Sequence, residues 1–351
     1  MKLRIWRYDL TVAHRWTIAR GLGPGGQGGD DVFPVVFAAL TDKDGVVGYG
    51  EAAPSPRYDE TADSVVAFLE RVNPYQLSFT DLPGSLRYLE SVGSRNYCAK
   101  GTLNLALLDG AAKLAGQPVH RFLGLDFQEG RHVTSFSIGL AAPDVIRQKV
   151  AEAERYPRLK LKLGGRTMPR PWPRCGRWPL TSPLRVDANE AWKTREEALR
   201  NLEWLAGDGN IEFVEQPMPA VADPADQAWL KERSPLPLMA DESYVYAGDV
   251  ERCAAGFHAV NVKLVKCGGI SAGMEALRAA RAAGLKTMLG CMIESSLLIS
   301  AAAHLAELTD YLDLDGNLLI TNDPFHGVGC RDGVLSWAEA PSKTGLRAAP
   351  R

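Results

Sequence analysis

The sequence has no marked excess of charge of either sign. Lysine and arginine number 40 against 42 aspartates and glutamates, and the net charge is −2. Binding to nucleic acid or to anionic membranes depends on a broad positive field, which this balance does not provide. We therefore expect neither kind of partner. A chain that is 46% hydrophobic and 23% charged has the composition of a globular protein, and we expect it to act on small molecules.

Long apolar runs are also missing. No stretch reaches the ~20 residues that span a bilayer, and the N-terminal MKLRIWRYDLTV alternates apolar and charged residues where a signal peptide has an apolar core. We expect a cytoplasmic protein. The cysteines include no CxxC pair and lack regular spacing, which favours buried or free thiols over disulfides. They are Cys98, Cys175, Cys253, Cys267, Cys291 and Cys330.

The hydrophobic period changes along the chain. Residues 1–55 contain three alternating runs, KLRIWRYDL, VFPVVFAAL and VVGYGEA, which predict antiparallel strands. Residues 60–114 show the helical period, so residues 1–125 are expected to form an α+β domain. From residue 126 to about 330, short apolar strands alternate with helices. This α/β pattern predicts about eight parallel strands closed into a barrel.

One segment breaks the alternation. Residues 164–183, GGRTMPRPWPRCGRWPLTSP, stand where a crossover helix is expected. Each proline inside a helix costs about 3 kcal/mol, so no regular helix is expected there. Two interpretations stay open: an irregular, polyproline-like crossover, or a short out-of-frame stretch. The interior prolines are Pro169, Pro171, Pro173 and Pro179.

Charged residues end five successive apolar runs of the alternating region. These residues are Lys162, Asp187, Glu215, Asp241 and Lys263, at intervals of 25, 28, 26 and 22 residues. Each interval is close to the combined length of one strand, one helix and two loops in a parallel α/β repeat. Alternation along the strands turns the five side chains into the barrel at its carboxyl end, where active sites of such barrels lie. We expect them to meet at one mouth.

The types of these residues predict metal-assisted proton transfer. Asp187, Glu215 and Asp241 would repel one another unless a divalent cation lay among them, and oxygen ligands favour Mg²⁺. Lys162 and Lys263 would stand on strands two and six, opposite each other in a ring of eight. One lysine can remove a substrate α-proton while the other delivers a proton to the opposite face, which inverts a stereocentre. Acting as bases requires lowered lysine pKa values, which we expect from the neighbouring Lys160 and Lys266 together with the metal.

These residues lie in motifs that resemble those of a known family. The motifs cover nearly the whole chain and are IARG, GEAAPSPRYDE, KLK, VDANEAW, EQP, ADES, NVKLVKCGG, LGCMIESS and DLDG. They are similar to motifs of dipeptide epimerases, of the L-Ala-D/L-Glu epimerase type, in the muconate-lactonizing subgroup of the enolase superfamily. The resemblance implies an N-terminal cap over a (β/α)7β barrel, with residues 331–351 returning to the cap. It also implies Mg²⁺-dependent epimerisation of dipeptides at the α-carbon of the C-terminal residue, through an enolate.

The resemblance assigns roles to residues of this chain. It implies that Asp187, Glu215 and Asp241 are metal ligands and that Lys162 and Lys263 are the acid/base pair. Lys160 is implied to stabilise the enolate. Asp313 and Asp315 in DLDG are similar to the family's D-x-D pair, which would hold the α-ammonium group of a dipeptide. Without the resemblance, DLDG is a turn that ends a strand.

Four further residues are candidates for substrate binding. Arg20 in IARG could meet the side-chain carboxylate of a glutamyl residue, since a guanidinium binds a carboxylate bidentately. It could equally be a surface arginine at a strand end. Arg57 and Tyr58 in the second cap loop, and Glu294 after the seventh strand, are expected to line the pocket.

Two alternatives remain at this point. A cycloisomerase or lyase of the same subgroup, such as a muconate cycloisomerase or an o-succinylbenzoate synthase, would use the same metal and lysines, although Asp313 and Asp315 suit its substrates poorly. The second alternative is an inactive or unstable binding protein. The segment 164–183 joins Lys162 to Asp187, and both residues would be displaced if that segment did not pack. A homo-oligomer is expected by analogy with other proteins of this fold.

Overall fold

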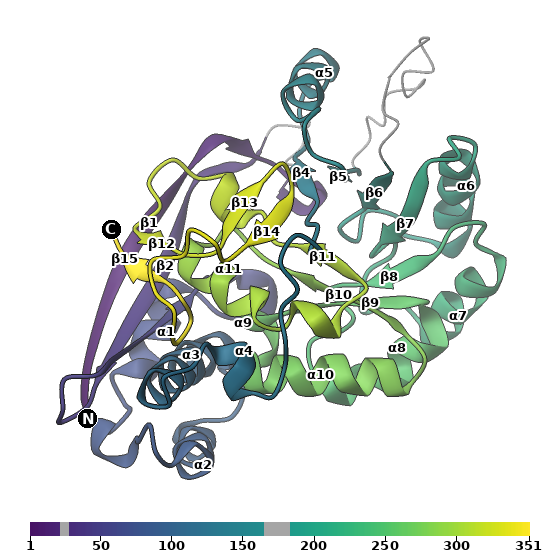
Figure 1. Ribbon diagram of the computed structural model, residues 1–351. Helices are drawn as coiled ribbons and strands as arrows, with labels where there is room; N and C mark the ends of the chain where they lie inside the picture. Colours follow the sequence, from purple (N-terminus) through teal and green to yellow (C-terminus); the bar gives the residue numbers. More distant parts are fainter. Residues whose placement is uncertain (22–27, 165–182) are drawn as a thin grey trace.

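The computed structural model describes residues 1–21, 28–164 and 183–351. Figure 1 shows an N-terminal sheet with its helices beside a barrel. The N-terminal sheet is antiparallel, in the order β1-β2-β3, as the three alternating runs predict. Its strands are β1 (Lys2–Trp16), β2 (Asp30–Thr41) and β3 (Val47–Ala52).

Helices cover one face of this sheet. The longest packs so closely on β3 that a Cβ atom on Gly48 would lie 2.0 Å from the carbonyl oxygen of Ala106, and one on Gly50 would lie 1.9 Å from that of Thr102. Only glycine permits this approach. The helical residues expected to be apolar, Val65 and Phe68 among them, are buried. The helices are α1 (Ala62–Leu69), α2 (Leu82–Val92), α3 (Tyr97–Leu114) and α4 (Val119–Phe122).

Eight parallel strands follow in sequential order, which confirms the predicted barrel. The first and last strands meet through a bridge between Thr134 and Leu312, and the Ser135 amide donates to the Leu312 carbonyl at 3.1 Å. The barrel is therefore nearly closed. Its strands are β4 (Phe136–Ile138), β5 (Leu159–Lys162), β6 (Leu184–Asp187), β7 (Ile211–Glu215), β8 (Leu238–Ala240), β9 (Ala259–Lys263), β10 (Lys286–Gly290) and β11 (Tyr311–Asp313).

Helices connect these strands along the outside of the barrel (Figure 1). Gly284 follows the helix before β10 with a φ of 77°, a conformation in which glycine commonly ends helices. The Pro-rich residues 165–182 lie outside the described residues. The helices are α5 (Pro143–Glu152), α6 (Arg195–Ala206), α7 (Pro224–Arg233), α8 (Val250–Gly256), α9 (Leu264–Cys267), α10 (Ile270–Ala282) and α11 (Ser296–Ala303).

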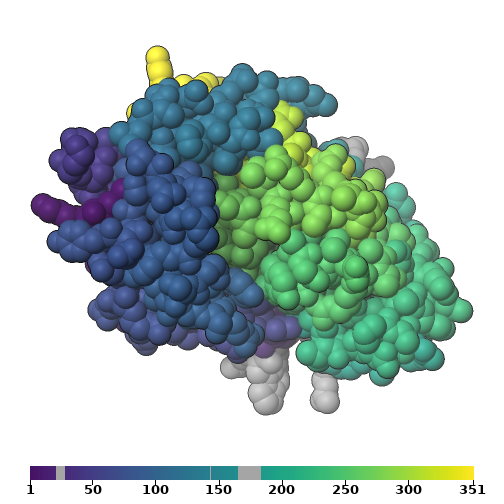
Figure 2. Space-filling view, turned by 90° about the horizontal axis from the view of Figure 1, so that it is seen from below, coloured from purple at the N-terminus to yellow at the C-terminus, as the bar shows by residue number. Residues whose placement is uncertain are grey.

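The cap helices and the barrel helices are in direct contact. Figure 2 shows the blue cap helices lying against the green part of the barrel. The Asn104 amide of α3 donates to the Ser271 hydroxyl of α10 at 2.8 Å. A Cβ atom on Gly101 would lie 3.0 Å from the backbone nitrogen of Gly269, so small residues let the two parts approach.

The C-terminal segment returns to the cap. Two of its strands pair with each other, and Phe325 packs on Phe37 of β2 with ring centroids 5.1 Å apart. The buried carboxylate of Asp109, on α3, accepts hydrogen bonds from the amides of Tyr49 at 2.9 Å and Leu346 at 2.7 Å. The segment comprises β12 (Phe325–His326), β13 (Gly329–Arg331), β14 (Val334–Ser336) and β15 (Ala349–Pro350).

Two sequence expectations can be compared with the described residues. No helix among them has the length and apolar character that crossing a bilayer requires. Cysteines 98, 253, 267, 291 and 330 are free thiols, as their spacing predicts, and Cys175 lies outside the described residues.

Replacing Asp109 by alanine should lower the free energy of unfolding by about 3 kcal/mol, because the buried Leu346 amide and the part-buried Tyr49 amide would lose their acceptor and the Lys113 ammonium would lose its carboxylate partner. Urea unfolding measures this change. Glu339→Ala removes an exposed carboxylate of the same C-terminal segment, 3.9 Å from Arg331, and should change stability by less than about 1 kcal/mol. Equal losses in the two variants would show that Asp109 does not join the segments.

Candidate active site

The five charged residues at strand ends lie together at the carboxyl end of the barrel. Backbone pairing sets Lys162, Asp187 and Glu215 side by side at one level of β5, β6 and β7. Asp241 directly follows β8, and Lys263 ends β9. The strand repeat therefore brings together the residues that the sequence intervals predict.

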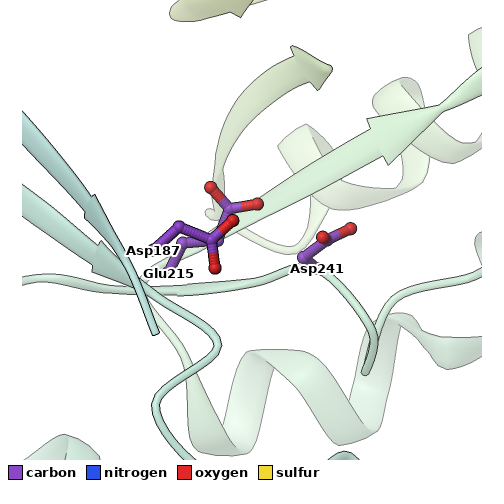
Figure 3. Close-up of side chains that lie close together, drawn as sticks. All are labelled: Asp187, Glu215 and Asp241. Atoms are coloured by element: carbon purple, nitrogen blue, oxygen red, sulfur yellow. The ribbon is translucent and has the colours of Figure 1, made fainter. Parts of the chain in front are cut away.

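Asp187, Glu215 and Asp241 lie close together at the ends of neighbouring strands (Figure 3). Each offers a carboxylate oxygen, and these oxygens lie within 4.8 Å of one another. All three side chains are buried. Burial and the charge of Asp187 raise the pKa of Glu215 to about 7. A compact, buried set of oxygen donors fits Mg²⁺, which binds carboxylates together with water and substrate oxygens.

Lysines surround the three carboxylates. Lys162 Nζ lies 2.6 Å from Asp187 Oδ2. Lys160 Nζ lies 2.7 Å from Glu215 Oε2, without hydrogen-bond geometry, and 3.4 Å from Asp187 Oδ2. Opposite charges at these distances keep the cluster tolerable in a buried environment.

Asp241 is held by two lysines. Lys263 Nζ lies 3.0 Å from Oδ2, and Lys266 Nζ donates to Oδ1 at 2.6 Å and to the backbone oxygen at 2.7 Å. Burial would raise the pKa of Asp241, but the charges of Lys263 and Lys266 outweigh it and hold the pKa well below its ordinary value. In turn, burial would lower the pKa of Lys263, but the charge of Asp241 raises it above its ordinary value. The carboxylate neighbour thus outweighs the neighbouring lysines, and the lowering of lysine pKa values by lysines together with the metal stays a prediction.

The two aspartates of DLDG have different environments. Asp313 Oδ2 lies 2.7 Å from Lys160 Nζ, and its Oδ1 accepts from the Ser135 hydroxyl at 2.6 Å. Asp315 Oδ2 accepts from the Ser137 amide at 2.5 Å. Burial would raise the pKa of Asp313, but Lys160 lowers it, whereas burial and the charge of Asp313 raise the pKa of Asp315 to about 7. Among the described residues, Asp315 has no cationic partner within salt-bridge distance.

A second charge cluster lies beside the metal-ligand candidates. Arg20 Nη1 lies 2.9 Å from Glu190 Oε2 and also bonds to Glu242 Oε1. Arg57 binds Glu190 bidentately, at 2.9 and 2.8 Å. Glu190 has a φ of 66°, which side-chain-bearing residues adopt rarely. The strained turn after β6 therefore aims this carboxylate at two arginines from the cap.

A cavity of about 430 Å³ opens over these residues. Asp187, Glu215, Arg57 and Glu294 are not part of its wall. Glu294 is buried behind it and accepts from the Met292 amide at 2.9 Å. Of the predicted residues, the wall includes Arg20, Tyr58, Lys160, Lys162, Asp241, Lys263, Asp313 and Asp315.

Some residues of the site were not predicted from the sequence. Glu190 and Glu242 each follow a proposed metal ligand within three residues, in VDANEAW and ADES, and their charge was the available signal. Lys266, on the short α9, was expected as a neighbour of the two lysines, but its bonds to Asp241 were not predicted. Ser135 and Ser137, which hold the two aspartates of DLDG, alternate along the first strand of the barrel. The alternation of the strand predicted that these serines point inward, but it could not identify the aspartates, 178 residues away, that they bind.

The chain matches two family descriptions. Residues 145–323 match "Enolase C-terminal domain-like", and residues 30–124 match "Mandelate racemase / muconate lactonizing enzyme, N-terminal domain". The chain belongs to the mandelate racemase/muconate lactonizing enzyme family of the enolase superfamily. The resemblance to this superfamily and the cap-and-barrel architecture that it implies are thereby confirmed.

Relatives in this family include named dipeptide epimerases. The chain is 53% identical to an "L-Ala-D/L-amino acid epimerase" of Pedosphaera parvula over 99% of both chains. It is 38% identical to an "L-Ala-D/L-Glu epimerase" of Bacteroides thetaiotaomicron over 97% of this chain and 86% of that protein. A similar solved structure is a dipeptide epimerase from Enterococcus faecalis complexed with Mg and L-Leu-L-Tyr, at 25% identity and a TM-score of 0.86 over 99% of this chain and 98% of that one.

Mg²⁺ should raise the thermal unfolding temperature of the protein, because an ion that binds only the folded state stabilises it, by about 2.7 kcal/mol at one hundred times its Kd. Glu215→Gln should lose most of this shift. Melting curves with and without MgCl₂ measure it. Asp226→Asn, which removes an exposed carboxylate 2.9 Å from Arg195, should keep the full shift. A shift of the same size in Glu215→Gln would show that the ion binds elsewhere.

Proposed function

We propose that the protein is a Mg²⁺-dependent epimerase of dipeptides that inverts the α-carbon of the C-terminal residue by a two-base proton transfer. The observation that carries this proposal is the pair Lys162 and Lys263. They end β5 and β9, four strands apart in a barrel of eight, and both line the same cavity. Two amines on opposite sides of one cavity can reach both faces of a substrate carbon.

The chain supplies the remaining groups of the mechanism. Asp187, Glu215 and Asp241 would hold the metal, which when bound supplies positive charge against the developing enolate. Nζ of one lysine takes the α-proton, and Nζ of the other gives a proton to the opposite face, so that one proton leaves and one is added. Lys160, on the same wall and 2.7 Å from both Glu215 and Asp313, adds a buried positive charge beside the reacting carboxylate.

Asp315 is the proposed ligand for the α-ammonium group of the substrate. Its carboxyl lines the cavity and has a backbone amide as its donor, and Asp313 beside it is matched by Lys160. A substrate ammonium would supply the missing cation. A cycloisomerase or lyase substrate that lacks an amine would leave a buried carboxylate unpaired, so this alternative is disfavoured.

The alternative of an inactive protein concerned the connection between Lys162 and Asp187. These two residues flank that connection and still meet at 2.6 Å. The geometry of the described residues thus supports an assembled site. The cytoplasmic location and the homo-oligomer stay predictions.

We also propose the division into a cap of residues 1–125, a barrel of residues 126–330 and a tail of residues 331–351 that returns to the cap. The two separate sheets and the bond between Leu346 and Asp109 support it.

In D₂O with Mg²⁺, wild-type protein should exchange the C-terminal α-proton of L-Ala-L-Glu or another L,L-dipeptide and form the L,D diastereomer. Proton NMR measures both events. Lys162→Ala and Lys263→Ala should each slow interconversion by about 10²–10⁴-fold, because one of the two proton-transfer groups is missing. Each variant should retain exchange for at most one of the two diastereomers.

Lys149→Ala is the matched control for these lysine variants, since Lys149 lies on α5 and outside the wall of the 430 Å³ cavity. It should leave interconversion intact. A lysine variant that still interconverts both diastereomers at the wild-type rate would exclude the two-base mechanism.

The kcat/KM for dipeptides should rise as the pH increases through about 7. Asp315, whose pKa burial and Asp313 raise to about 7, is protonated below that pH and binds an ammonium group only when ionised above it. Above about 8 the substrate amine loses its charge and kcat/KM should fall again. Initial rates measured between about pH 5.5 and 9 give the profile, because this range includes the pKa values of both groups. In Asp315→Asn the limb near pH 7 should disappear; an unchanged limb would assign it to another group.

A further inference from the structure

The arginine that faces the substrate cavity is already engaged. Arg20 lies in the short helix η1 (Ala19–Gly21) and lines the cavity, with 30% of its side chain exposed. Its guanidinium binds the carboxylates of Glu190 and Glu242. A substrate carboxylate would have to compete with two protein carboxylates for this group.

Glu190 holds a second arginine at the same time. Both oxygens of its carboxylate meet the guanidinium of Arg57, and Oε1 also accepts from the Ala220 amide at 2.8 Å. Only 8% of its side chain is exposed. Glu190 is thus fixed from three directions, by two cap arginines and by the loop after β7.

The charges of this cluster balance. The two arginines carry two positive charges, and Glu190 and Glu242 carry two negative charges when ionised. An acidic substrate side chain placed beside Arg20 would add a third carboxylate to a partly buried neutral cluster, which like-charge repulsion and desolvation oppose.

The rest of the described cavity wall has few groups that could bind an acidic substrate side chain. Its other cations are Lys160, Lys162 and Lys263, and each meets a carboxylate at the strand ends within 3.0 Å. Much of the remaining wall is apolar and includes Ile18, Val32, Phe33, Pro54, Met292 and Leu319. Such a surface favours a side chain that leaves water at low cost.

We propose that Glu190 determines specificity by withholding Arg20 from the substrate, so that the enzyme prefers dipeptides with an uncharged, apolar C-terminal side chain over those with an acidic one. This inference rests on the proposed dipeptide epimerase activity. Glu190 acts through Arg20, which lines the cavity, and is a positioning residue.

A competition experiment tests the preference directly. Equimolar L-Ala-L-Leu and L-Ala-L-Glu are incubated with the wild-type protein and Mg²⁺ in D₂O, and the loss of each C-terminal α-proton is followed by NMR. The ratio of the two kcat/KM values should favour the leucine dipeptide by about tenfold or more, a discrimination that unpaired charge in a binding site readily produces. This measurement depends on no variant.

The variant Glu190→Gln tests the cause. It leaves two arginines against one carboxylate, so the ratio should shift toward L-Ala-L-Glu by about tenfold or more. Adding Arg20→Met to this variant should reverse the shift, because the guanidinium that lines the cavity is then gone. Asp226→Asn, which breaks the surface pair with Arg195, should leave the ratio at its wild-type value.

The outcomes separate this inference from the proposed function. A wild-type preference for L-Ala-L-Glu, or a ratio unchanged in a folded Glu190→Gln protein, would overturn the role of Glu190 while epimerisation stands. Loss of neither α-proton, with wild-type protein that melts cooperatively, would overturn the proposed function and the inference with it.

Discussion

The compensation of buried charge at the mouth of the barrel is the constraint on which the rest of the site depends. Asp187, Glu215 and Asp241 are buried with carboxylate oxygens within 4.8 Å of one another, and lysines on the same rim meet each of them. Neither set is tolerable alone, because a buried charge without a partner is strongly destabilising. The register of β5, β6 and β7, which sets lysine beside aspartate beside glutamate, is therefore also an electrostatic arrangement.

The same compensation distinguishes structural charges from charges that await a ligand. Asp313 is matched by Lys160, and Glu190 by Arg57. Asp315 differs, since its described donor at short range is a backbone amide and its pKa is raised to about 7. The cap also contributes to the cavity wall. Its loops bring Arg20 and Tyr58 to a cavity that barrel residues line as well. The site therefore exists only where the two parts meet.

Much of the fold was predictable because it follows from the hydrophobic periods of the sequence and from the length of the strand–helix repeat. Strand alternation and the repeat interval place Lys162 and Lys263 on one rim without any knowledge of distant contacts. The start of α6 shows the limit. Thr194 and Glu197 have the spacing of a capping box, and the Thr194 hydroxyl accepts from the Glu197 amide, but the Glu197 carboxylate accepts from the Lys193 amide instead of the Thr194 amide. Local chemistry predicted the helix and one of the two bonds.

Residues beyond the strand ends were harder to place. The direction of Glu190 depends on a left-handed backbone at the turn after β6, which neither alternation nor repeat length encodes. Arg57 and Glu294 stand in motifs next to the site, but the first turns to Glu190 and the second lies behind the cavity wall. Nearness in sequence gives a residue's neighbourhood, whereas its direction depends on partners that are up to hundreds of residues away.

The bond between Asp109 and the Leu346 amide joins positions 237 residues apart. A ribosome adds residues from the N-terminus at about 5–20 per second, so the cap helix waits at least ~10 s for the segment that completes its packing. During that interval the acceptor oxygen and the apolar surface beneath the tail face solvent or a chaperone. Truncation near the C-terminus would for the same reason damage the first part of the chain to be made.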